Sequence, residues 1–84
     1  MTINETVEAI DVFLERYQNG GLRPVERRVL PSAEDNDVIK VWIDLGPAGT
    51  NADLDAWAHA CEAAILAGVK GSREWKLKVK VEAG

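Results

Sequence analysis

The strict alternation of apolar and charged residues near the end of the chain constrains its fold most. In residues 73–82, tryptophan, leucine and two valines occupy every second position from 75 to 81, and lysine or glutamate flanks each of them. Successive side chains of a strand point to opposite faces, so this pattern predicts a strand with one buried and one charged face. Residues 38–45 alternate in the same way. We therefore expect both segments in one half-buried sheet.

Two other segments have the period of amphipathic helices. In residues 3–18 apolar side chains recur every three or four positions, which places them on one face. Thr2 followed by Glu5 fits a capping box at the start, and Asn19, Gly20 and Gly21 are expected to end this helix. Residues 50–67 predict the second helix, with Thr50 and Asp53 as another capping box.

A third strand is expected in residues 22–31, which prolines bracket, and a polar turn in residues 32–37. The predicted element order is α-β-β-α-β within a single domain of residues 1–84. This order predicts a small two-layer α+β sandwich, in which a three-stranded sheet carries both helices on one face. We expect the strand of residues 22–31 to lie between the other two strands.

The alternation also predicts which side chains cover each face of the sheet. The inward side chains are expected to be apolar and to pack under the helices. They are Ile39, Val41, Ile43, Leu45, Trp75, Leu77, Val79 and Val81. The outward side chains are expected to be charged, apart from one tryptophan. They are Lys40, Trp42, Asp44, Lys76, Lys78 and Lys80.

Charge is unevenly distributed along the chain. Ten basic and fourteen acidic residues give a net charge of −4, which argues against a dedicated nucleic-acid-binding protein. However, residues 70–82 hold five basic and two acidic residues, and residues 22–31 hold three basic and one acidic. If these two strands are neighbours, their outer faces form one basic patch with Trp42 at its border.

Four local patterns are weak candidates for chemical sites. His59 and Cys61 stand two residues apart, about 200° around a helix, so they cannot share a metal ion or act as a catalytic pair. The acidic residues 34–37 lack the ligand spacing of a calcium loop, and residues 46–51 lack the lysine of a phosphate-binding loop. Residues 68–71 share only letters with a nucleic-acid-clamping G-x-x-G loop. We expect no catalytic, cofactor or metal site.

The sequence favours a small, non-catalytic interaction protein. An outward tryptophan is the residue most expected to contact a partner, which is either another protein or a second copy in a homodimer. The predicted partner-binding residues are Trp42, Lys40, Lys76, Lys78 and Lys80. Two alternatives stay open: single-stranded nucleic acid on the same face, and an enzyme subunit whose site is completed by a partner chain.

The expected compartment follows from the single cysteine. Cys61 has no second cysteine with which to form an internal disulfide, so a reducing, cytoplasmic location is expected. The first residues carry no basic, apolar leader pattern, and no apolar run is long enough to span a bilayer. We therefore expect neither a cleaved signal peptide nor a membrane partner.

Overall fold

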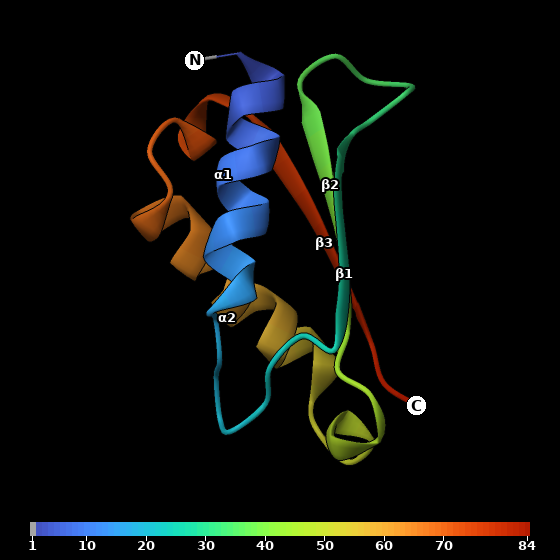
Figure 1. Ribbon diagram of the computed structural model, residues 1–84. Helices are drawn as coiled ribbons and strands as arrows, with labels where there is room; N and C mark the ends of the chain where they lie inside the picture. Colours follow the sequence, from blue (N-terminus) through green and yellow to red (C-terminus); the bar gives the residue numbers. More distant parts are fainter. Residues whose placement is uncertain (1) are drawn as a thin grey trace.

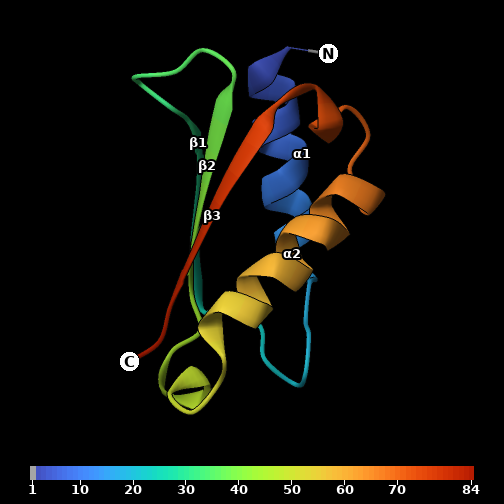
Figure 2. The same ribbon diagram turned by 180° about the vertical axis from the view of Figure 1, so that it is seen from behind.

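The computed structural model describes residues 2–84 and confirms the predicted order of elements (Figure 1). The helices are α1 (Ile3–Glu15) and α2 (Leu54–Gly68), and the strands are β1 (Glu26–Pro31), β2 (Val38–Asp44) and β3 (Lys76–Glu82). Short 3-10 turns, Pro47–Gly49 and Ser72–Glu74, precede α2 and β3. Both helices lie on the same side of the sheet (Figures 1 and 2), which makes the predicted two-layer α+β fold.

The order of the strands differs from the prediction. The sheet runs β1-β2-β3, with β2 antiparallel to β1 and parallel to β3, so β2 and not β1 is central. A central strand needs backbone donors on both sides, and Pro31 in β1 has no N–H to give. β2 has no proline, and its Ile39, Val41 and Ile43 are buried. The two basic strands are therefore separated by β2 and are not neighbours.

Helix α1 ends at Glu15, three residues before the predicted end. Beyond it, Asn19 and Leu22 exchange two backbone hydrogen bonds of 2.9 and 3.0 Å, so the Asn-Gly-Gly segment forms a separate turn. The early end lets Tyr17 pack edge-on against Trp57, with 5.4 Å between ring centroids. Aromatic packing against α2 thus begins in the segment that follows α1.

Of the two predicted capping boxes, the structure contains the one at the start of α1 and not the one at the start of α2. The first capping box is confirmed, since the Glu5 N–H donates to Thr2 Oγ1 at 3.2 Å and the Thr2 N–H donates to Glu5 Oε1 at 3.0 Å. The second is wrong. Asp53 itself is the N-cap of α2, while the Thr50 hydroxyl donates to the Pro47 carbonyl at 2.7 Å in the preceding 3-10 turn. The proline-initiated turn therefore uses the residues predicted to start the helix.

The hydrophobic core lies between the sheet and the helices, as predicted. The inward residues of β2 are buried against Ile10 and Leu14 of α1 and Cys61 and Ile65 of α2, and the inward residues of β3 are half-buried. The strands begin later than predicted, β1 at Glu26 and β3 at Lys76, because a turn precedes each of them. Within residues 2–84, this packing leaves the opposite side of the sheet free of helices.

Candidate partner-binding surface

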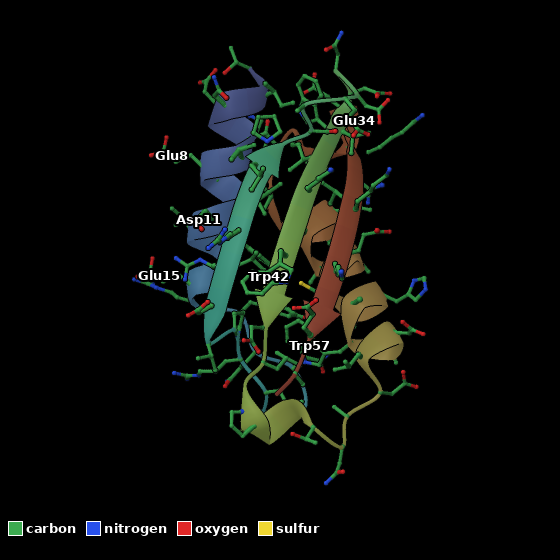
Figure 3. All side chains as sticks on the ribbon, turned by 90° about the vertical axis from the view of Figure 1, so that its right-hand side faces the viewer. Glu8, Asp11, Glu15, Glu34, Trp42 and Trp57 are labelled. Atoms are coloured by element: carbon green, nitrogen blue, oxygen red, sulfur yellow. The ribbon has the colours of Figure 1, made fainter. Side chains whose placement is uncertain are left out.

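The side of the sheet turned away from the helices is the candidate site, which we call the open face (Figure 3). The register across the strands sets which side chains share it, because directly paired residues point to the same side. Its members are Glu26, Arg28 and Leu30 from β1, Lys40, Trp42 and Asp44 from β2, and Lys76, Lys78, Lys80 and Glu82 from β3. The predicted assignment of side chains to the two faces is confirmed for β2 and β3.

Trp42 lies in the middle of the open face (Figure 3). It is paired with Arg28 on β1 and with Lys80 on β3. The guanidinium carbon of Arg28 is 5.8 Å from the centre of the Trp42 ring, a distance typical of a cation–π contact. The indole Nε1–H donates to Glu82 Oε2 at 3.0 Å. These two contacts fix the orientation of the half-buried ring from both sides.

Lysines occupy much of the remaining face, and all four are exposed. Lys40 and Lys78 are paired across β2 and β3 next to the Trp42 row, and within residues 2–84 neither forms an ion pair. Lys80 Nζ lies 3.5 Å from Glu82 Oε1, and Lys76 Nζ lies 3.6 Å from Oδ2 of Asp37 in the turn after β1. Coulomb attraction toward an anion is thus concentrated at Lys40 and Lys78.

Acidic residues form one complete row at the other end of the open face. Glu26, Asp44 and Glu82 are in register across the three strands. Asp44 is further engaged, because its Oδ1 accepts the Gly46 N–H at 2.8 Å. The charge of the open face therefore changes sign along the strands, with acidic side chains at the carboxyl end of β2 and lysines toward its start.

The structure brings most of the predicted partner-binding residues together. Trp42, Lys40, Lys78 and Lys80 occupy two adjacent rows, whereas Lys76 lies one row farther, paired with Val38. Arg28 was not predicted, because the expected strand order placed β1 against β3 and left Trp42 at the border. Pro31, which marks β1 as an edge strand, was the signal that would have placed Arg28 beside Trp42.

Two hollows on this surface are only partly enclosed. One of about 620 Å³ is lined by Lys40, Trp42, Lys78 and Lys80 and also by Leu77 and Val79 of β3 and Glu62 of α2. Another of about 360 Å³ lies between Arg28 and Trp42. A further hollow of about 610 Å³ lies outside the open face, at the end of α1 beside Tyr17. Small molecules usually bind in concave pockets that enclose most of their surface. The hollows of the open face do not enclose a ligand in this way.

Two of the weak chemical candidates, Cys61 and His59, lie on α2. Cys61 is 0% exposed, and burial, reinforced by the charge of Glu62, raises the pKa of its thiol to about 12. His59 is exposed on α2. Within residues 2–84 no group of three or more histidine, cysteine and acidic side chains is arranged to hold a metal ion.

In the part of the chain that the structure describes, no helix has the length and apolar character needed to cross a bilayer. Comparison of the chain with protein-family models, with curated proteins and with solved structures finds no match.

Proposed function

We propose that this protein is a non-catalytic interaction module whose open face binds an acidic segment of another protein. One observation carries the proposal: Trp42 stands in the middle of a sheet face that no helix covers, with exposed Lys40, Lys78 and Lys80 around it. Tryptophan and arginine are the residues that most often dominate the energy of protein interfaces. Here both are adjacent, since Arg28 stacks on Trp42.

The internal contacts of Trp42 suit it to binding. A side chain that is already held by Arg28 and Glu82 loses less rotational freedom when a partner covers it. The ring remains half-buried and not fully buried, so it still has apolar area to contribute. Lys40 and Lys78 would attract an acidic segment and speed its encounter with the face. The site thus combines an apolar anchor with electrostatic steering.

The acidic row favours a protein partner over nucleic acid. A single strand that follows the lysines of β3 would meet Glu82 and then Asp44, which repel phosphates. Single-strand binding also relies on several aromatic platforms, whereas Trp42 is the one aromatic residue on this face and Arg28 already stacks on it. A protein segment can place acidic residues over the lysines and other residues over the acidic row.

Self-association is the second candidate, and the acidic row is the observation that favours it. A second copy can pack on the open face with a two-fold axis along the row of Trp42, so that the strands of the two copies run in opposite directions. Asp44 of each copy then faces Lys40 of the other, and Glu82 faces Lys78. The same arrangement brings Arg28 and Lys80 of each copy against their own counterparts. These like charges oppose the homodimer, which is why a different protein is the preferred partner.

The proposal is tested by capture and measurement with matched variants. Proteins retained from native extract by the immobilised wild type should be lost with Trp42→Ala and kept with Glu8→Ala, which changes an exposed residue on α1. Calorimetry with the purified partner should then show about 30-fold weaker binding for Trp42→Ala, the effect of an interface hot spot of about 2 kcal/mol. Equal affinity of both variants would contradict the proposal.

Light scattering separates the two candidates. A monomer at high concentration supports a different protein as the partner, whereas a dimer that Trp42→Ala dissociates would identify a second copy. The proposal also includes a reducing compartment, because the only cysteine is a free and buried thiol.

A further inference from the structure

We infer that the outer edge of β3 accepts an added strand from an acidic protein segment. β3 is at the end of the sheet and pairs only with β2. The Lys76 N–H donates to the Asp37 carbonyl at 2.8 Å, and the Leu45 N–H donates to the Glu82 carbonyl at 2.9 Å. The even-numbered residues of β3 therefore direct their backbone N–H and C=O groups toward β2. In a parallel pair the intervening residues point both backbone groups the other way. Leu77, Val79 and Val81 therefore direct their N–H and C=O groups outward.

These outward groups form a regular row of hydrogen-bonding positions. Within residues 2–84, the backbone groups of Leu77, Val79 and Val81 make no hydrogen bond with a loop, a cap or a side chain. Such a row is a template for an added strand unless proline, a bulge, a covering segment or charged side chains such as lysine block it. The lysines of β3 therefore oppose a basic or apolar strand, and only a strand of opposite charge compensates them. β3 contains no proline, and its pairing with β2 is continuous from Lys76 to Glu82.

The other edge of the sheet is less suited to a fourth strand. The Ser32 N–H donates to the Val38 carbonyl at 2.9 Å, so the even-numbered residues of β1 direct their backbone groups toward β2. The backbone groups of Arg27, Val29 and Pro31 therefore point away from the sheet. Pro31 has no N–H, so this row lacks a donor. An ion pair of 2.9 Å between Arg27 and Asp11 of α1 also holds a side chain at this edge. β3 is thus the edge with a complete set of donors and acceptors.

The side chains that flank the β3 edge specify the pattern of the added strand. Lys76, Lys78 and Lys80 project on the open-face side, so acidic residues at alternate positions would lie opposite them. On the helix side the half-buried Val79 borders a small hollow of about 150 Å³ together with Asp55 and Glu62 of α2. Intervening residues that are short and uncharged fit there, because acidic ones would be repelled.

A second copy of this chain does not meet these requirements. If two β3 edges paired antiparallel over their full length, about Val79, Lys78 of each copy would stand directly opposite Lys80 of the other. The register about Val81 sets Lys80 opposite Glu82, but it pairs only residues 80–82 of each strand. Like charges directly opposite each other destabilise a strand pair. The edge of β1 offers no better match, because it lacks the donor at Pro31 and also carries Arg28 on the open-face side. The occupant is therefore a different, acidic protein.

This inference takes the acidic character of the partner from the proposed function and adds the mode of binding. An added strand would place its acidic side chains beside the lysines of β3, while the rest of the partner covers Trp42. The lysines thus serve the edge and the open face together. The two ideas can be tested apart, because Val79 lies on the edge and Trp42 lies one strand away.

The test uses ¹⁵N-labelled protein and the blocked synthetic peptide Glu-Thr-Glu-Val-Glu-Thr-Glu, followed by NMR titration and amide exchange. In the free protein the amides of Leu77, Val79 and Val81 should exchange much faster than those of Lys78 and Lys80, which bond to β2. Adding the peptide should slow the three outward amides. The matching peptide with lysine in place of glutamate should bind at least about tenfold more weakly.

Two variants decide whether the backbone edge is used. Val79→Pro removes an outward N–H, which an edge strand tolerates, and should weaken peptide binding at least about tenfold. Val79→Ala keeps the N–H and should bind nearly as well as the wild type. If Val79→Pro does not fold, the double variant Lys78→Glu with Lys80→Glu replaces it and should reverse the preference in favour of the lysine peptide.

The remaining outcomes contradict one proposal or the other. No binding of the glutamate peptide, equal binding by Val79→Pro and Val79→Ala, or unchanged preference in the double variant would each overturn the added strand. If a captured partner is then lost with Trp42→Ala but kept with Val79→Pro, the proposed function stands without it. Peptide binding at β3 together with a Trp42→Ala variant that keeps its partner would contradict the open-face proposal instead.

Discussion

Neighbouring residues on β2 offer a direct contrast between folding and binding. Trp42 points to the open face, and Ile43 points to the core, where it is 0% exposed. If Trp42 is a binding residue, its removal should cost the fold little, whereas removal of Ile43 should cost much. We therefore predict different losses of stability for Trp42→Ala and Ile43→Ala, although Trp42 has the larger side chain.

The contacts of the two residues give the expected magnitudes. Ile43→Ala leaves a cavity between the sheet and the helices and should cost about 3–4 kcal/mol. Trp42→Ala removes the contact with Arg28 and a surface hydrogen bond to Glu82, and each is worth about 0.5–1 kcal/mol. With some lost cross-strand packing, the expected cost is about 1–2 kcal/mol.

Urea unfolding followed by far-UV circular dichroism measures both values without relying on tryptophan fluorescence, which Trp42→Ala itself alters. The slopes of the unfolding free energy against urea should agree among the three proteins, so that the midpoints can be compared. If Trp42→Ala costs as much as Ile43→Ala, Trp42 is chiefly a structural residue, and the reasoning that assigns it to a partner is refuted.

Three further predictions concern the fold. The Cys61 thiol should resist alkylation in the native protein. Because burial raises its pKa from 9.0 to about 12, the unfolded chain loses this proton first, and the stability from the neutral thiol should be complete below pH 9 and decline as pH rises toward 12. Cys61→Ala should lack this decline. Gly68→Ala should destabilise by about 1 kcal/mol despite better helix propensity, because a methyl group there would lie 2.8 Å from the Phe13 ring, and Phe13→Ala should remove this penalty in thermal unfolding. Thr2→Ala should cost about 1 kcal/mol by the same assay, since Thr2 caps α1, and no loss would contradict the capping box.

Local patterns in the sequence predict the elements and faces of this fold well. Alternation in β2 and β3 assigns Lys40, Trp42, Lys78 and Lys80 to the open face, and the structure places them there. This works because the side-chain period of a strand and the burial of one face are local properties. The capping box at Thr2 is predictable for the same reason.

Properties that depend on distant contacts could not be predicted in the same way. The place of β1 in the sheet decides whether Arg28 lies beside Trp42, and periodicity within one strand does not contain that information. The early end of α1 is accompanied by the packing of Tyr17 against Trp57, which lies on the other helix and is distant in sequence. The acidic row is likewise visible only when three strands are in register.

The indole N–H signals of the three tryptophans provide the most direct test of the open face. Trp57 donates to the Asn19 carbonyl and Trp75 donates to the Thr6 hydroxyl, both on the helix side of the sheet, whereas Trp42 donates to Glu82 on the open face. When ¹⁵N-labelled protein is titrated with its captured partner, the Trp42 indole signal should shift and the other two should not. Shifts confined to Trp57 or Trp75, or no indole shift at saturation, would contradict binding at the open face.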